Sequence, residues 1–304
     1  MRGSYFVAAL VCGAIAIQPV CANARNAPEA RGASLSAARP GPSIALPSDT
    51  IRRLKSGNEG NIKSALDDVR VAGRAGAPAV PTIVELLNAG LSLPLTKAAL
   101  ETLGDTGSDA ASETIGFYTR HRNVELRRLA VSALAKTRGS TTVKALRWAL
   151  ADSDPTVRGL AATELGTLKA KEAVADLFAA LEHNVPEAAA AIGELCADSD
   201  CERLAGKVGS LPFDVVTSGL DEVLLRAAPD VKDELKIKIV GNVRELGTGQ
   251  ANRFLKGVQT RWPQRASLRV KQAIDQAVLA TSSSPGADPS DGKRAPASIP
   301  GGVR

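Results

Sequence analysis

Aliphatic residues recur at helical spacing through the middle of this chain, and the stripe that they form repeats. Residues 143–150 carry Val, Leu and Leu at positions i, i+3 and i+7, and residues 174–181 carry the same types 31 positions later. Each stripe predicts one face of a helix that packs into a core. Small residues at the ends of successive helices keep nearly the same step, in the series Gly73, Gly104, Ala135, Gly166 and Cys196. This register of about 31 residues predicts repeated helical hairpins.

Turns between the stripes set the bounds of the expected helices. The pattern predicts paired helices over 51–73 with 78–89, 93–103 with 108–120, 124–136 with 140–151, 155–168 with 171–183, and 186–196 with 201–208. Beyond Gly209 the register is less regular, and helices are expected over 213–227, 230–246, 249–261 and 264–280, with Leu246 and Gly247 closing a further repeat. A lone hairpin cannot bury both of its apolar faces, so the copies must stack into an elongated superhelix over residues 49–280.

Both ends of the chain differ in composition from the repeats. A basic start, an apolar run over 5–17 and small residues at 22–24 predict a secretory signal peptide, residues 1–24. The run is shorter than the about 20 residues of a membrane span, so no stable membrane insertion is expected after cleavage, and an uncleaved anchor is the alternative. Residues 25–48 and 281–304 are rich in Ala, Pro, Gly and Ser without periodicity, which predicts a disordered linker and a disordered C-terminal tail.

The charge balance narrows the choice of partner. The full chain has 304 residues, with 38 Lys and Arg against 32 Asp and Glu. Cleavage after Ala24 removes Arg2 and no acidic residue, which leaves a mildly basic formal charge of +5. Export argues against nucleic acid as a partner, whereas an acidic protein or an anionic envelope surface fits such a chain. We therefore expect a periplasmic or extracellular protein with one or more protein partners, which the sequence does not name.

Two cysteines remain after cleavage, Cys196 and Cys201. In an oxidising compartment such a pair is a candidate disulfide. On one unbroken helix their Cα atoms would lie beyond the about 7 Å that a bridge can span, so the bridge requires a turn between two helices. Two free thiols at a helix junction are the alternative, and the spacing argues against a redox-active pair.

Residues able to carry chemistry are few. His121 and His183 are the chain's two histidines, they lie on different repeats, and neither has the spacing of a metal ligand. Residues 247–249 lack the Lys-Ser/Thr of a phosphate-binding loop. Adjacent carboxylates such as Asp67 and Asp68 point in different directions on a helix. We therefore expect no catalytic residues, no metal and no cofactor, and a protein that is not an enzyme.

One pair of aromatic residues stands out in the second helices of the repeats. Aligning the core positions Ile115 and Leu146 puts Phe117 and Trp148 in one column, two residues beyond the stripe. Second helices are expected to line a concave side, so this pair predicts a binding face of the kind found at interface hot spots. The charged residues that border the pair are Glu113, Lys144, Arg147 and Arg120. The alternative is a Trp packed in the core between repeats.

Residues 152–166 carry a resemblance to a known family. Their opening Asp-Ser-Asp-Pro-Thr-Val-Arg and their closing Ala-Ala-Thr-Glu-Leu-Gly resemble the first helix of HEAT repeats, in particular the PBS-lyase HEAT-like type. Residues 123–130 repeat that pattern, and residues 76–81 resemble its second-helix opening. The resemblance implies an all-α, right-handed α-solenoid of helical hairpins, and usually a scaffold. Ala188 stands where the repeats carry Arg, so the Asp/Arg ladder expected along such stacks is interrupted there.

Three functions follow from this family, and the sequence favours the first. An exported chain without catalytic motifs is expected to be a non-enzymatic protein–protein interaction scaffold that displays a preordered helical groove in the cell envelope. Bilin lyases resemble the same repeats, so a chromophore lyase or isomerase is an alternative, which the secretory signal argues against. HEAT-type nucleic-acid binding, similar to that of HEAT-repeat DNA glycosylases, is another, and it requires a cytoplasmic pool of uncleaved chain.

Overall fold

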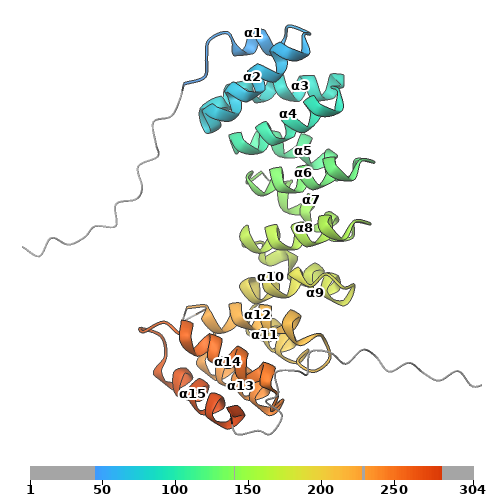
Figure 1. Cartoon of the computed structure of the whole chain (residues 1–304). Helices are drawn as coiled ribbons and strands as arrows, with labels where there is room; N and C mark the ends of the chain where they lie inside the picture. Colours follow the sequence, from blue (N-terminus) through green and yellow to red (C-terminus); the bar gives the residue numbers. More distant parts are fainter. Residues whose placement is uncertain (1–44, 140, 228–229, 283–304) are drawn as a thin grey trace, which may run out of the picture. The chain divides into compact units, whose positions relative to one another are not determined.

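The computed structural model describes residues 45–139, 141–227 and 230–282. Within these ranges the chain forms α-helices and short 3₁₀ segments and no β-strand (Figure 1), so the predicted all-α class is confirmed. No helix in the same ranges is long and apolar enough to cross a membrane. The helices run from Thr50 to Ser282, close to the predicted solenoid bounds. The predicted signal peptide, and nearly all of the predicted linker and tail, lie outside the described residues and stay predictions.

Two rows of helices build the stack, because each repeat contributes one helix to each row. The first row consists of α2 (Glu59–Ala72), α4 (Leu93–Thr106), α6 (Val124–Ala135), α8 (Pro155–Thr167), α10 (Glu187–Leu195) and α12 (Phe213–Leu225). The second row consists of α3 (Val80–Ala89), α5 (Ser112–Tyr118), α7 (Thr142–Ala149), α9 (Val174–Glu182), α11 (Asp198–Ala205) and α13 (Asp233–Glu245).

Further helices close both ends of the stack, and 3₁₀ segments connect the rows in three places. Helix α1 (Thr50–Leu54) packs on α2, whereas α14 (Gly249–Arg261) packs on α12 and α15 (Leu268–Ser282) packs on α13. The 3₁₀ segments are η1 (Gly73–Ala79), η2 (Asp109–Ala111) and η3 (Lys171–Ala173).

Polar residues start several first-row helices. Asn58, Asn123 and Asp154 each accept a hydrogen bond from a backbone N–H in the first turn of α2, α6 and α8, which gives a partner to a donor that the helix itself cannot pair. Gly57, at φ +69°, turns the chain just before Asn58. The single helix predicted over 51–73 is therefore wrong, because this turn divides it into α1 and α2.

The repeat register continues beyond Gly209, where the sequence pattern is less regular. Leu225 ends α12 and stands 30 positions after Leu195, which ends the preceding first-row helix. Leu246 and Gly247 instead follow the end of α13 in the second row, so they do not close the expected repeat. The pattern missed Leu225 because Arg226 follows it, in place of the small residue that marks the earlier repeat ends.

Aliphatic side chains from both rows form the core. The predicted stripe is confirmed, since Leu146, Leu150, Leu177 and Leu181 are all buried. One hydrophobic cluster runs through the described helices, and many of its members are alanines. Small side chains let neighbouring helices approach closely, which explains how a chain with 3% aromatic residues fills a thin interior.

Glycines bring α10 and α12 into backbone contact. A Cβ on Gly193 would lie 2.1 Å from the carbonyl oxygen of Gly219, and a Cβ on Gly219 would lie 2.3 Å from that of Ala189. Neither position accepts a larger side chain without moving a helix. The crossing of these two helices therefore requires both glycines.

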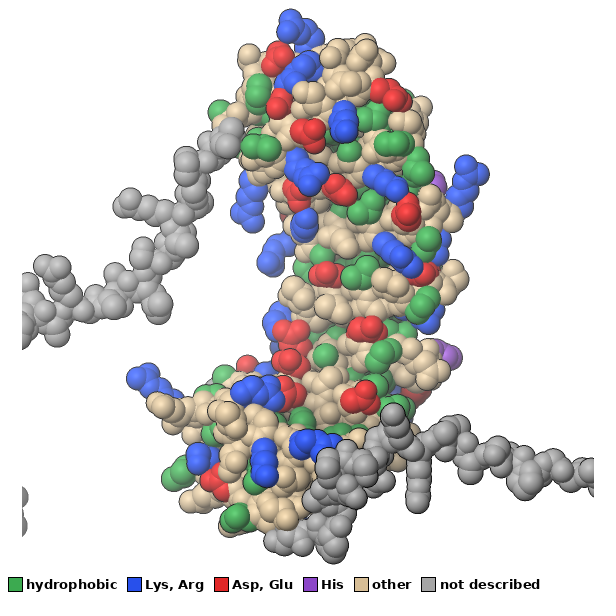
Figure 2. All heavy atoms as spheres, in the orientation of Figure 1, with side chains coloured by type: hydrophobic (Ala, Val, Ile, Leu, Met, Phe, Trp, Pro, Cys, Tyr) green, Lys and Arg blue, Asp and Glu red, His purple; other side chains and the backbone are tan. Residues whose placement is uncertain are grey.

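Paired charges link successive repeats. The Arg127 guanidinium donates to both carboxylate oxygens of Asp152, at 2.8 Å each, and Arg128 donates to both oxygens of Asp154 at 3.1 and 2.7 Å. Such two-pronged contacts are among the stronger hydrogen bonds in proteins. On the face that Figure 2 presents, Lys and Arg side chains are interleaved with Asp and Glu side chains.

The Asp/Arg ladder ends one step before the predicted interruption. Arg158, one repeat after Arg127, donates to the backbone carbonyls of Asp152 and Ser153. Among the described residues it has no carboxylate partner, because His183 stands one repeat after Asp152. Ala188, where the interruption was expected, is fully buried.

A disulfide joins Cys196 to Cys201, as the sequence predicted. Cys196 directly follows α10 and Cys201 lies in the first turn of α11, so the turn between the helices brings the two Cα atoms to 5.3 Å. Helix α11 begins at Asp198, earlier than the predicted position 201. The bridge therefore fixes the connection between the two rows at this repeat.

Leu165→Ala and Leu177→Ala should each lower the free energy of unfolding by about 2–5 kcal/mol, because each leaves a cavity in place of a fully buried side chain. Urea denaturation followed by circular dichroism measures the change. Leu268→Ala is the control: this side chain is 68% exposed, and its loss should change stability by less than about 0.5 kcal/mol. Unchanged midpoints in both core variants would contradict the repeat register.

Gly193→Ala should destabilise the fold by at least about 1–3 kcal/mol, because the new methyl group meets the backbone of α12. Gly241→Ala is a matched control inside α13, where a Cβ would meet nothing within 4 Å, and it should stabilise the fold by about 0.5–1 kcal/mol. Thermal unfolding compares the two variants. Equal effects of the two substitutions would show that α10 and α12 do not cross so closely.

The contribution of Asp154 to stability should depend on pH. Hydrogen bonds from Arg128, and then from the Val157 backbone N–H, hold the pKa of Asp154 below its ordinary value of 3.8. A carboxyl whose pKa is lower in the folded state stabilises the fold above its unfolded value, and this contribution disappears as the pH falls through the folded value.

Asp154→Asn keeps a capping side chain and removes the charge, so it isolates this effect. The variant should be less stable than the parent near neutral pH, and the difference should shrink below pH 3.8. Urea midpoints across a pH series provide the measurement. A difference that stays constant into strong acid would rule out the charged pair as its cause.

Candidate functional site

Two aromatic side chains project from neighbouring helices of the second row. Ile115 in α5 and Leu146 in α7 are fully buried, and helix geometry turns a residue two positions further on by about 200°. Phe117 is accordingly 73% exposed and Trp148 is 58% exposed. Of the two alternatives for this pair, the structure has exposed aromatics and not a Trp packed between repeats.

Arg120 connects the two helices through Trp148. Its guanidinium carbon lies 3.8 Å from the centroid of the indole ring. The chain reaches this position in a turn after α5, where the Arg120 backbone N–H donates to the carbonyl of Phe117 at 3.2 Å. A guanidinium over an indole face is attracted by the ring quadrupole, by about 0.5–1 kcal/mol at an exposed site. The contact holds the indole of α7 against the end of α5.

The other predicted residues share this surface but differ in their bonding. Arg147 donates to the carboxylate of Asp176 on α9 at 2.5 Å. Lys144 and Glu113 are exposed, and neither forms an ion pair with another described residue. We call the six predicted residues together the aromatic face: Glu113, Phe117, Arg120, Lys144, Arg147 and Trp148.

Grooves lie on both sides of Trp148. One of about 330 Å³ opens beside the turn after α5 and includes Arg122 in its lining. Another of about 610 Å³ opens between α7 and α9 beside Lys144. A third of about 520 Å³ continues past Arg147 and reaches Arg158 and His183. Trp148 therefore forms a ridge between two hollows.

Sequence reasoning did not connect Arg158 and His183 with this surface. The repeat register could have indicated that the two residues lie together, since Arg158 stands 31 positions after Arg127 and His183 stands 31 positions after Asp152. The first repeat pairs its Arg with its Asp, whereas in the next repeat His183 replaces the carboxylate. Only the structure showed that both residues line one groove.

Helix spacing differs between the two rows. First-row helices pack directly on one another at each step from α2 to α12, whereas α7 and α9, and likewise α9 and α11, lack comparable backbone packing among the described residues. The grooves of about 610 and 520 Å³ lie between α7 and α9, whereas the groove of about 330 Å³ lies between the ends of α5 and α7. The predicted position of the aromatic face on a concave side stays a prediction.

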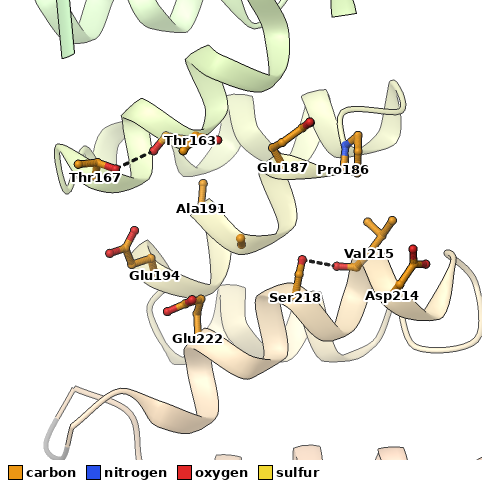
Figure 3. Close-up of a pocket in the computed structure, with 11 residues that line it drawn as sticks. Thr163, Thr167, Pro186, Glu187, Ala191, Glu194, Asp214, Val215, Ser218 and Glu222 are labelled. Atoms are coloured by element: carbon orange, nitrogen blue, oxygen red, sulfur yellow. Dashed lines mark hydrogen bonds between the residues drawn. The ribbon is translucent and has the colours of Figure 1, made fainter. Parts of the chain in front are cut away.

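A hollow of a different character lies on the first row. It has a volume of about 420 Å³ and is lined by residues of α8, α10 and α12. Its carboxylates come from Glu187, Glu194, Asp214 and Glu222, and Figure 3 shows Glu194 and Glu222 at one end of it. Partial burial raises the pKa of Glu222, and the neighbouring charges of Glu194 and Asp221 raise it further. This surface is acidic, in contrast to the aromatic face.

The histidines take part in local contacts. His121 accepts a hydrogen bond from the Asn123 backbone N–H at 3.0 Å, and its ring stacks on Tyr118 with 5.8 Å between centroids. His183 is exposed at the end of α9. Across the described ranges, no group of three or more His, Cys, Asp and Glu side chains is placed to hold a metal ion.

Residues 117–197 match the family model of HEAT repeats. Among solved structures, the chain is similar to the complex of CpcE and CpcF of phycocyanin lyase from Nostoc sp. PCC7120, with 17% identity, a TM-score of 0.41, and coverage of 80% of this chain and 97% of that chain.

Two engineered proteins are also similar, with 15% and 16% identity and TM-scores of 0.44 and 0.37. These matches cover 77% and 78% of this chain and 68% and 98% of the engineered chains. No curated protein matches the chain. The part that matches the HEAT-repeat model, residues 117–197, carries the exposed aromatic pair and its grooves.

Proposed function

We propose that this chain is a non-enzymatic scaffold that binds a protein partner on the aromatic face, and that it works in the cell envelope or outside the cell. The fold supports the scaffold role, because stacked helical repeats present extended surfaces for binding. The observation that carries the proposal is the exposure of Phe117 and Trp148 on neighbouring second-row helices. Trp and Arg are the residue types that most often dominate the free energy of protein association.

The aromatic face is ordered before it meets a partner. Arg120 lies over Trp148, and Arg147 is held by Asp176. Fixing a long side chain costs about 0.5–1.5 kcal/mol on association. Because these side chains already have partners, less of this cost remains to oppose binding.

Charge indicates the chemistry of the partner. Arg120, Arg122 and Lys144 are exposed and have no carboxylate partner among the described residues. Glu113 and Glu172 contribute fewer negative charges to the same surface. A protein segment with Asp or Glu beside an apolar side chain complements this arrangement, since the apolar group covers the aromatics and the carboxylates meet the cations.

Export is the part of the proposal that rests on residues 1–24, which lie outside the described residues. The Cys196–Cys201 disulfide supports it, because structural disulfides persist mainly in oxidising compartments. Sequencing the N-terminus of the purified protein tests this part separately, and the expected first residue is Arg25.

Photo-crosslinking in intact native cells tests the binding face. A crosslinking amino acid at position 144, an exposed site beside Trp148, should capture one partner protein, whereas the same amino acid at position 63, an exposed site on α2, should not. The double variant Phe117→Ala/Trp148→Ala should lower recovery of that partner at least tenfold, since hot-spot truncations each cost about 2 kcal/mol or more.

Val71→Ala/Leu268→Ala is the matched control, because it also removes two exposed apolar side chains and should leave recovery unchanged. Circular dichroism confirms that both double variants are folded. Full recovery of the partner by the Phe117→Ala/Trp148→Ala variant would move the binding site elsewhere. A visible absorption band on the purified protein would instead favour the bilin-lyase alternative.

A further inference from the structure

A further pocket lies near the C-terminal end of the described helices, outside the aromatic face and the acidic hollow. It has a volume of about 300 Å³ and is formed by the end of α12, the start of α13 and the segment between α14 and α15. Its apolar lining comes from Leu224, Leu225, Ala227, Trp262, Pro263 and Ala266. Small-molecule sites typically have such a size and such walls, with a few polar groups that orient the ligand.

Lys236 places a positive charge in this apolar lining. The side chain is only 4% exposed, and its amine donates to the carbonyl oxygen of Arg226. An ammonium group has three donors, so two remain for another acceptor. The amine also lies 5.6 Å from the centroid of the Trp262 ring, which forms part of the same pocket.

Arg226 adds a second, half-buried cation to the lining of this pocket. Its terminal nitrogens donate to the carbonyls of Gly193, Glu194 and Cys196 at 2.7–3.2 Å, whereas its buried Nε has no partner. Neither Arg226 nor Lys236 forms an ion pair with a described carboxylate. Burial lowers the pKa of both groups, although nearby carboxylates, Asp230 for both cations and Asp233 for Lys236, act in the opposite direction.

The remaining polar groups at the pocket also favour an anion. Trp262 is 9% exposed, and its indole N–H is buried without an acceptor. Arg265 is exposed at the pocket. Asp233 is the pocket's one carboxylate among the described residues, and it already accepts a hydrogen bond from the Ser267 hydroxyl. Donors therefore exceed acceptors in a pocket that is otherwise apolar.

We infer that this pocket binds a small organic carboxylate, with the carboxylate on the Lys236 amine and the apolar body against Trp262 and the leucines. A carboxylate supplies acceptors for the donors that lack a partner and places a negative charge in direct contact with Lys236, and it forms strong charge-assisted hydrogen bonds. The apolar walls favour a ligand with a hydrocarbon body over inorganic phosphate, whose oxygens on every side would each need a donor.

Benzoate is a suitable probe, and benzyl alcohol is its neutral counterpart of similar shape. Calorimetric titration of the full-length protein should show saturable benzoate binding, with benzyl alcohol at least tenfold weaker. In parallel, the indole N–H signal of Trp262 should shift in NMR spectra on addition of benzoate. Trp148→Phe assigns that signal, because the chain has two tryptophans.

Lys236→Met should weaken benzoate binding at least tenfold, and Lys238→Met should leave it unchanged. Lys238 is a matched control on the same helix, with a side chain that is 60% exposed. Ala266→Leu, which fills the pocket and keeps its charges, should also abolish the Trp262 shift. This variant preserves the test if Lys236→Met does not fold.

Several results would overturn the inference. Absence of saturable binding would show that Lys236 only caps the C-terminal end of α12. Equal affinity for benzyl alcohol would show that the pocket recognises apolar shape without the carboxylate. Undiminished binding by folded Lys236→Met or Ala266→Leu would place the ligand elsewhere. None of these results depends on the aromatic face. The proposed scaffold function is therefore tested separately, by the photo-crosslinking experiment.

Discussion

Contact between small residues in the first row is the constraint on which this structure depends. A Cβ on Gly104 would lie 2.9 Å from the Cα of Ala133, and one on Gly166 would lie 3.2 Å from the Cα of Ala191. At Gly193 a side chain has even less room, because a Cβ there would lie 2.1 Å from the backbone oxygen of Gly219. Each repeat thus presents a flat surface to the next, and short side chains fill the interior at the density of a packed core.

This close first row leaves the second row free to carry surface features. One groove opens between α7 and α9 on one side of Trp148, and another opens beside the turn after α5 on its other side. The first row instead presents the acidic hollow between α8, α10 and α12. The described helices therefore carry two surfaces of opposite charge, one on each row.

The sequence predicted the elements best where local rules act alone. Stripes at helical spacing located the buried leucines, and the turn between Cys196 and Cys201 allowed the disulfide that the structure contains. The predicted helix boundaries were wrong where the residue that usually marks a helix end is absent or where a turn interrupts the apolar pattern. Gly57 divides a helix that the apolar pattern joins, and Arg226 follows the end of α12 in place of a small residue. Arg226 stands there because its side chain reaches the carbonyl groups at the end of α10.

By itself the sequence determined the class of fold, the repeat length and the column that contains Phe117 and Trp148, because periodicity and register depend on spacing along one chain. Only the tertiary structure decided that these aromatics are exposed, that Arg120 covers Trp148, and that Lys236 and Arg226 line one pocket without a direct ion pair to a described carboxylate. These facts depend on the distance between neighbouring helices and on which side chains meet across it. Such distances are set by packing between repeats, which no single repeat encodes.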